Sequence, residues 1–215
     1  MRISPDQYKA VIFDLDGVLI DSMPHHVRAW QEVFRSFGVE LPDEELRMHE
    51  GEKAKITIGR LARKHGLNFN DDELEQLVEQ KRQIYRRSAP RGLRSAAARI
   101  LKQLQIHGFK LAIVTGSVRP NLEWTLSEQD LSNFQAIVTS EECQNGKPSA
   151  DPYLLAAKRL DLQPSQCLVI ENAPLGIRSA KTAGMKCIGI TTTLPAETLN
   201  EADWIMPDLD GLQIG

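Results

Sequence analysis

Hydrophobic residues occur in five short, nearly uninterrupted runs spread along the chain. Each run contains Val or Ile and ends at small or polar residues. Strands that are apolar on both faces are typical of parallel sheets that helices cover on both sides. The pattern therefore predicts strands at residues 8–13, 111–114, 136–138, 167–170 and 187–190.

Between these runs the apolar residues recur at helical spacing. Leu101 and Leu104, for example, lie on one stripe of a segment that Gly108 brings to an end. Helices are accordingly predicted at residues 95–107, 151–160 and 175–183. An alternation of strand and helix predicts an α/β fold with a doubly wound parallel sheet.

Residues 23–90 follow a different pattern. They contain no convincing strand, are rich in charge, and show helical spacing in segments that Gly38, Pro42 and Gly66 separate. We therefore expect an all-α helical cap inserted after the first strand. The catalytic core would then consist of residues 1–22 and 91–215.

Polar residues follow four of the predicted strands. They are Asp14 and Asp16 after the first, Thr115, Gly116 and Ser117 after the second, Lys147 in the loop after the third, and Glu171 and Asn172 after the fourth. In α/β sheets of this kind, ligands bind beyond the carboxyl ends of the strands. We expect these side chains to meet at one edge of the sheet.

The residue types suit phosphoryl transfer. A carboxylate can approach an anionic phosphate ester only where cations offset the repulsion, and Mg²⁺ prefers hard oxygen ligands. Such ligands occur at Asp14, Asp16, Glu171 and Asn172. Lys147 would add a fixed positive charge. Thr115 offers a hydroxyl, and the amides of Gly116 and Ser117 offer donors for phosphate oxygens.

Asp14 and Asp16 are two positions apart, and this spacing suggests how they would act together. Residues two apart in an extended segment point to the same side, so Asp14 and Asp16 would flank one phosphorus if the strand continues that far. One would attack while the other handles the proton of the leaving group. Gly17 permits a sharp turn after them.

These segments resemble a known family. FDLDGVLIDS resembles the first motif of the haloacid dehalogenase superfamily, and VTGS, GKPSADPY and VIENAPLGIRSAKTAGM resemble its second, third and fourth motifs. The resemblance covers nearly the whole chain, and the helical insertion looks like the small α-helical cap of the phosphatase and β-phosphoglucomutase branch.

The resemblance implies roles for the residues at the strand ends. Asp14 matches the nucleophile that becomes an aspartyl-phosphate, and Asp16 matches the general acid and base. Thr115 and Lys147 match the phosphate-binding pair. The side chain of Asp14, the carbonyl of Asp16 and the side chains of the fourth motif match the Mg²⁺ site.

The chain also departs from the pattern of this branch. The fourth motif commonly reads Glu-Asp, whereas this chain has Glu171-Asn172, which removes one formal negative charge from the metal site. In the cap, His26 and Lys81 resemble residues that β-phosphoglucomutases place near the substrate. The arginine expected there soon after Gly51 is absent, because Ala54 stands in its place.

Composition limits the partners. The formal net charge is −3, so no overall positive field favours nucleic acid, and the basic stretch at residues 82–94 is interpreted as a helix end and hinge. The three cysteines are widely spaced, without a CxxC motif, and are expected to be reduced thiols. The first residues resemble neither a signal peptide nor a membrane span, so we expect a cytoplasmic protein without a membrane partner.

The sequence thus predicts an Mg²⁺-dependent phosphatase that acts on a small phosphorylated metabolite, such as a sugar phosphate. The main alternative is a β-phosphoglucomutase-type sugar phosphate mutase. A dehalogenase is disfavoured because haloacids do not need the acid that Asp16 supplies. A non-enzymatic phospho-receiver is a distant alternative, since receivers place the phosphorylated Asp in a middle strand and have no cap. Oligomeric state leaves no signal in the sequence.

Overall fold

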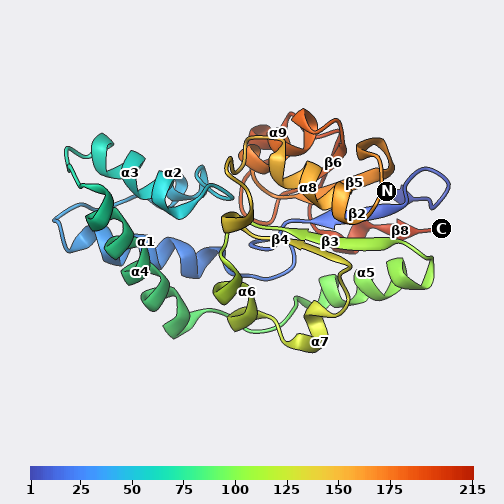
Figure 1. The fold of residues 1–215 in the computed structure, drawn as a ribbon, viewed down its shortest axis with the longest axis horizontal. Helices are drawn as coiled ribbons and strands as arrows, with labels where there is room; N and C mark the ends of the chain where they lie inside the picture. The colour runs from blue at the N-terminus through green and yellow to red at the C-terminus, as the bar shows by residue number, and fades with distance from the viewer.

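A six-stranded parallel sheet lies at the centre of the computed structural model, which describes all 215 residues (Figure 1). The strands, in their order across the sheet, are β4 (Ala136–Val138), β3 (Lys110–Val114), β2 (Ala10–Phe13), β5 (Cys167–Glu171), β6 (Lys186–Ile190) and β7 (Trp204–Met206). The first five of these in chain order are the predicted strands, although β2 begins two residues later than expected.

The order of the strands reverses at β2. The chain continues from β2 to β3 and β4 on one side, and then returns to β5, β6 and β7 on the other. Phe13, the last residue of β2, lies opposite Ile113 of β3 and Ile170 of β5. The residue that follows, Asp14, therefore emerges at the crevice where such sheets bind ligands.

Successive side chains of the central strand face opposite layers of helices. Val11 and Phe13 pack with the apolar stripe of α5 (Ser95–Ile106), while Ile12 packs on the other face against α8 (Asp151–Arg159) and α9 (Pro174–Thr182). Figure 1 shows α5 below the sheet, with α8 and α9 above it. The doubly wound α/β fold is thus confirmed, with helix ends within one residue of those predicted.

A separate group of helices lies between β2 and β3 in sequence. They are α1 (Met23–Arg35), α2 (Asp43–Arg47), α3 (Ala54–Lys64) and α4 (Asp71–Ser88). These helices have their own apolar core, which includes Phe34, Leu61 and Tyr85, and they extend away from the sheet at the left of Figure 1. We call residues 23–90 the cap from here on.

Several short elements were not predicted. They are β1 (Arg2–Ile3), α6 (Arg119–Thr125), α7 (Glu128–Leu131), β8 (Gln213–Ile214), and the 3₁₀ segments η1 (Ser140–Glu142), η2 (Pro164–Gln166), η3 (Ala196–Leu199) and η4 (Leu209–Gly211). The edge strand β7 was also missed. It has only three residues, none of them fully buried, so it lacks the long apolar run that marks the inner strands.

Two features concern the environment of the chain. No helix is both long enough and apolar enough to cross a membrane. Cys143, Cys167 and Cys187 are buried and none is paired in a disulfide.

Candidate active site

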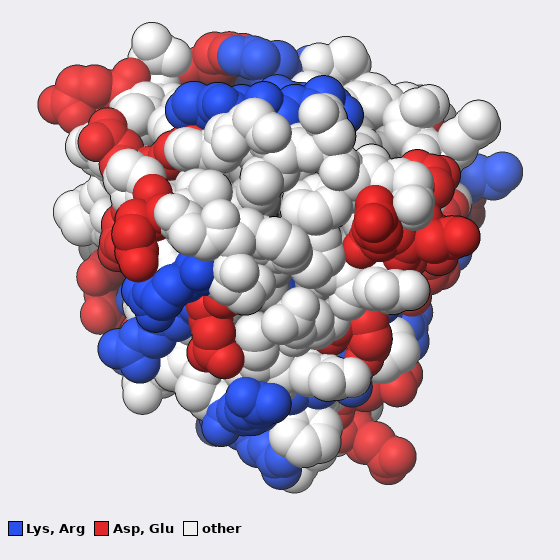
Figure 2. Space-filling view, turned by 90° about the vertical axis from the view of Figure 1, so that its left-hand side faces the viewer, with Lys and Arg blue, Asp and Glu red and all other residues white.

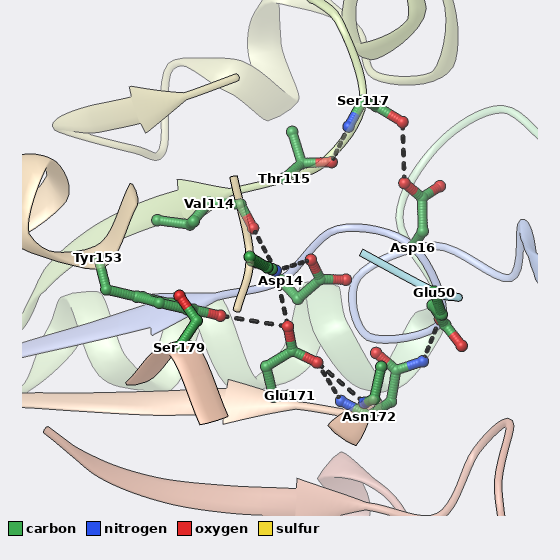
Figure 3. A network of polar contacts seen from close by, with 12 residues as sticks. Asp14, Asp16, Glu50, Val114, Thr115, Ser117, Tyr153, Glu171, Asn172 and Ser179 are labelled. Carbon is green, nitrogen blue, oxygen red and sulfur yellow. Dashed lines mark hydrogen bonds and ion pairs between the residues drawn. The ribbon is translucent and has the colours of Figure 1, made fainter. Parts of the chain in front are cut away.

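Asp14 lies directly beyond the carboxyl end of β2 and is almost completely buried. One of its carboxylate oxygens, Oδ1, accepts a hydrogen bond of 2.6 Å from Nζ of Lys147, although the two residues are 133 positions apart. No protein group donates to the other oxygen, Oδ2. The side chain is therefore held firmly at one oxygen and has the other available for chemistry (Figure 3).

Glu171, at the end of β5, is the second counter-ion of Lys147. Its Oε1 accepts from Nζ of Lys147 at 2.6 Å and from the hydroxyl of Tyr153 at 3.2 Å, and its Oε2 accepts from the backbone amides of Asn172 and Ala173. We expected Glu171 among the metal ligands. Here both of its oxygens accept hydrogen bonds from protein donors, one of which is Lys147, and its role as a metal ligand stays a prediction.

Asp16 points toward the cap. Its Oδ1 accepts from the hydroxyl of Ser22 at 2.6 Å and contacts Nε2 of His26 at 2.9 Å, while its Oδ2 accepts from the hydroxyl of Ser117 at 3.0 Å. The extended strand stops at Phe13, before Asp16 is reached, so the simple same-side geometry of a continuous strand does not apply. Residues from the cap entry and from the loop after β3 orient Asp16 instead.

His26 and Lys81, the two cap residues singled out in the sequence, continue this network. Nζ of Lys81 lies 2.6 Å from Nδ1 of His26, and the imidazole stacks on the ring of Tyr85. An ammonium can only donate, so Nδ1 must accept and a neutral His26 carries its proton on Nε2, where it donates to Asp16. The structure thus brings His26 to Asp16 directly, and Lys81 to Asp16 only through His26.

The protein surroundings shift the pKa values of the two acids in opposite directions. Burial raises the pKa of Asp14 to about 8, and repulsion from Glu171 also raises it. The attraction of Lys147 lowers this pKa but does not outweigh the other two effects. Burial would also raise the pKa of Asp16, but the attraction of His26 and the hydrogen bonds from His26, Ser22 and Ser117 outweigh it and hold that pKa well below its usual range. The cap thus favours the ionised form of Asp16, because it brings His26 to the carboxylate as well as burying it.

The loop after β3 presents the expected phosphate-binding groups. Thr115 is buried beside the end of the strand, and its hydroxyl accepts from the amide of Ser117 at 3.0 Å. A side chain at Gly116 would approach the carbonyl oxygen of Gly51 to 2.5 Å, so only glycine lets the cap loop lie against this segment. The backbone of this loop is thus close to both the core and the cap.

Asn172 faces a residue that the sequence analysis did not single out. Its amide Nδ2 donates to Oε1 of Glu50, which belongs to the cap, and to the hydroxyl of Thr193 at 2.8 Å. That hydroxyl in turn donates to Oε2 of Glu50 at 3.0 Å. Gly17, which has a φ of +84°, leaves the space in which these groups meet, because a side chain there would collide with the Asn172 amide.

The donor set fits a divalent cation. The carbonyl oxygen Oδ1 of Asn172 is buried and has no hydrogen-bond partner, which is costly unless something else satisfies it. No backbone amide donates to the carbonyl of Asp16. The buried carboxyl groups of Asp14 and Glu171 share the single ammonium of Lys147, and burial raises the pKa of Asp14 and of Glu50, so a further cation would stabilise their ionised forms. Mg²⁺ prefers such hard oxygen ligands.

A cavity of about 640 Å³ separates the cap from the core. Asp14, Asp16, Gly116 and Ser117 line it from the core side, and His26, Trp30, Glu50 and Lys81 are among the residues that line it from the cap. The volume lies within the usual range for small-molecule sites. Six of the predicted site residues line this cavity: Asp14, Asp16, His26, Lys81, Gly116 and Ser117. The other four, Thr115, Lys147, Glu171 and Asn172, are buried behind it.

Sequence reasoning missed four residues of the network, namely Ser22, Glu50, Tyr153 and Thr193. Ser22 and Tyr153 stand inside segments that were recognised, but their partners become visible only in three dimensions. Glu50 is an acid in a loop 122 positions from Asn172, and no local pattern links the two.

A parallel α/β sheet with a buried carboxylate and lysine at its strand ends, and a helical insertion beside them, is the architecture of one class of hydrolases. Comparison with known proteins agrees. The profile described as haloacid dehalogenase-like hydrolase matches residues 11–190, and the chain belongs to this family. It is an enzyme of the branch that includes β-phosphoglucomutases and sugar phosphatases with a small helical cap.

Individual relatives cover nearly the full chain. The chain is 35% identical to validoxylamine A 7'-phosphate phosphatase of Streptomyces hygroscopicus subsp. limoneus, over 94% of each protein. It is 31% identical to hexitol phosphatase A of Escherichia coli, over 96% of this chain and 94% of that one. A solved structure described as a putative β-phosphoglucomutase from Bacteroides vulgatus superimposes with a TM-score of 0.84 at 33% identity, covering 94% of this chain and 85% of the other.

Proposed function

We propose that the protein is an Mg²⁺-dependent phosphatase that hydrolyses a small sugar or polyol monophosphate through a phosphorylated Asp14. The observation that carries the proposal is the state of Asp14, which is buried at the end of β2 with one oxygen held by Lys147 and the other free of protein donors. A carboxylate nucleophile needs this combination of fixed position and available oxygen.

Each residue then has a defined task. The carboxylate of Asp14 attacks phosphorus, while the Thr115 hydroxyl and the amide of Gly116 hold the non-bridging oxygens. The amide of Ser117 donates to the Thr115 hydroxyl, which leaves the hydroxyl proton for the phosphate. Asp16 must first take up a proton against the low pKa that its partners impose; it then gives this proton to the departing alkoxide, and later takes one from the attacking water, which transfers the phosphoryl group to water. Lys147, held by Glu171, offsets the negative charge of the phosphoryl group.

The residues that would hold Mg²⁺ are Asp14, through its side chain, Asp16, through its carbonyl, and Asn172, through Oδ1. The bound ion would neutralise charge between the nucleophile and the phosphate. Glu171 belongs to this group only through Lys147, because its own oxygens are occupied.

The cavity favours a substrate with one phosphate and an uncharged remainder. Lys53 donates to the carbonyl oxygens of Cys143 and Gln144, Lys55 pairs with Asp71 and Glu75, and Lys81 is bonded to His26. None of these lining ammonium groups is left to bind a second phosphate. The relatives named as phosphatases of validoxylamine 7'-phosphate and of hexitol phosphates also point to a polyhydroxylated alcohol.

A β-phosphoglucomutase-type mutase is the second candidate, and it rests on the likeness to the putative β-phosphoglucomutase structure. A mutase must bind a bisphosphate intermediate at both ends. Ala54, which stands near the cap loop where the mutases have an arginine, favours the phosphatase.

Nucleic acid does not fit this site. Lys, Arg, Asp and Glu are interspersed around uncharged residues on the cap face of the molecule, without a continuous basic surface (Figure 2). A substrate small enough to enter the cavity is the better match.

The test is a phosphatase assay across a panel of sugar and polyol monophosphates, run with Mg²⁺ and again with a chelator. Phosphate release that depends on Mg²⁺, and that is lost in Asp14→Asn, supports the proposal. Turnover that persists with the chelator would exclude the metal-dependent mechanism. Efficient interconversion of β-glucose 1-phosphate and glucose 6-phosphate, with little phosphate released, would favour the mutase.

A further inference from the structure

Glu50 is a cap residue that lies in the core's metal-binding region. It belongs to the loop between α2 and α3, is only 5% exposed, and contacts Asn172 and Thr193 of the core. Neighbouring residues anchor the same loop. Gly51 lies against Gly116, and Lys53 donates to the carbonyl oxygens of Cys143 and Gln144.

Burial raises the pKa of Glu50 well above its ordinary value, but its hydrogen bonds are those that an ionised carboxylate makes. Oε1 accepts from the amide of Asn172 and Oε2 accepts from the hydroxyl of Thr193, so each oxygen faces a donor. The hydroxyl is itself satisfied, because it accepts from the same amide. Figure 3 shows the contact between Asn172 and Glu50, with Glu171 bonded to the backbone amide of Asn172.

This arrangement determines which way the Asn172 amide points. With Nδ2 directed at Glu50 and Thr193, the carbonyl oxygen Oδ1 has no protein donor. The reverse orientation would place that carbonyl oxygen against the carboxylate of Glu50, which is repulsive. An aspartate at position 172 would place an oxygen against the carboxylate of Glu50 in either orientation, because both of its oxygens are acceptors. Glu50 and Asn172 are therefore chemically matched.

We propose that Glu50 is a positioning residue for the metal site, and that it supplies from the cap the negative charge that the amide of Asn172 does not carry. The inference rests on the proposed function, in which Asn172 Oδ1 holds Mg²⁺. It adds that the site is complete only when the cap loop lies on the core. Binding of the ion and docking of the loop then strengthen each other by the same factor, since such coupling is reciprocal.

Mg²⁺ titration by calorimetry, without substrate, tests the inference on four full-length proteins: wild type, Glu50→Gln, Asn172→Asp and the double variant. Glu50→Gln should weaken Mg²⁺ binding about tenfold, as loss of an outer partner of a metal ligand does. Glu44→Gln, the same change at an exposed position of α2, is the control and should leave the affinity within about twofold.

The double variant gives the sharper result. The amide introduced at position 50 can donate to the carboxylate introduced at position 172, so the contact is restored with donor and acceptor exchanged and the charge returned to the core. We expect its Mg²⁺ affinity to lie within about threefold of wild type, although Glu50→Gln alone should weaken Mg²⁺ binding. Because the double variant keeps the hydrogen bond between positions 50 and 172, it can test the inference even if Glu50→Gln does not fold.

Hydrogen exchange of residues 48–53 provides a readout that does not depend on affinity. Mg²⁺ should slow exchange of this loop in the wild type and in the double variant, but not in Glu50→Gln. If Glu50→Gln binds Mg²⁺ as Glu44→Gln does, or if the two changes are additive, the inference is wrong while the proposed hydrolysis stands. If the wild type binds no Mg²⁺, the metal in the proposed function fails and the inference fails with it.

Discussion

The ammonium of Lys147 lies 2.6 Å from Oε1 of Glu171, and the same nitrogen lies 2.6 Å from Oδ1 of Asp14. One cation therefore links the nucleophile candidate to the strand end beside it. Burial lowers the pKa of Lys147, but the attraction of Asp14 and Glu171 outweighs burial and raises that pKa overall. The lysine stays charged whether or not a phosphate is bound.

The first prediction concerns the nucleophile. Asp14→Asn should reduce turnover at least a hundredfold, because an amide cannot form the covalent intermediate. The fold should persist, since Lys147 keeps Glu171 as its partner. Phosphate release measures the loss, and circular dichroism checks the fold. A well-folded variant that retains more than a few per cent of the activity would rule out covalent catalysis through Asp14.

The second prediction concerns Glu171 as a structural residue. Glu171→Gln should lower the free energy of unfolding by about 3 kcal/mol, because it breaks a buried ion pair and places an amide against donors. Tyr153→Phe removes only one hydrogen bond to the same carboxylate and should cost about 1 kcal/mol. Urea unfolding of both variants provides the comparison. Equal small losses would mean that Glu171 contributes little beyond the tyrosine contact.

The third prediction separates the proton-transfer role of Asp16 from a merely structural one. Asp16→Asn should slow phosphorylation of Asp14 by sugar phosphates about a hundredfold, the usual range for acid catalysis. An aryl phosphate should be affected less, because its leaving group needs little protonation. Single-turnover measurements are required, since Asp16 also acts in the second step. Equal losses with both substrates would show that Asp16 only positions other groups.

The fourth prediction concerns the cap residues behind Asp16. His26→Gln keeps a hydrogen-bond donor but removes the titrating ring, and Lys81→Met removes the ammonium that holds Nδ1. Both should reduce turnover of sugar phosphates about tenfold to a hundredfold while leaving the Mg²⁺ affinity unchanged. Lys55→Met, on the same cavity but paired with Asp71 and Glu75, is the control. An equal loss in the control would assign the effect to the charge of the cavity.

The fifth prediction concerns stability against pH. Burial would raise the pKa of Asp203, but hydrogen bonds from Lys181, Lys186 and the amide of Cys187 outweigh it and lower that pKa from 3.8 to about 2. A carboxyl with a lowered folded pKa stabilises the protein above its unfolded pKa, and loses this contribution as the pH falls toward the folded pKa.

Asp203→Asn should therefore cost about 1 kcal/mol of unfolding free energy at pH 7 and progressively less between about pH 4 and pH 2. Denaturant unfolding across that window measures the difference between the two proteins. A constant difference at every pH would mean that the Asp203 ion pairs do not stabilise the fold.

The sequence was sufficient for the inner strands and for the catalytic candidates at their ends. Runs such as 167–170 are apolar because both faces of the sheet are covered, and Asp14 follows such a run at the strand end where sheets of this kind bind ligands. Long apolar runs and strand-terminal polar residues are local signals, so they can be found without coordinates.

What the sequence could not provide is pairing between distant segments. The roles of Glu171 and Asn172 looked alike from their neighbouring positions, yet Glu171 is saturated by donors while Asn172 keeps an unpartnered oxygen. The protonation of Asp16 depends on His26, whose ring reaches it from the cap. Such differences arise from side-chain orientation and burial, which no spacing rule encodes.

The small sheet of β1 and β8 joins the first and the last segments of the chain to be synthesised. Arg2 lies opposite Gln213, and the amide of Gly215 donates to the carbonyl of Ile3. On a ribosome, β1 therefore has no partner until the residues of β8 have been added. At about 5–20 residues per second, that wait is roughly 10–40 s. During this time Ile3, which is fully buried in the finished protein, remains without its cover, so this part of the core is among the last to form.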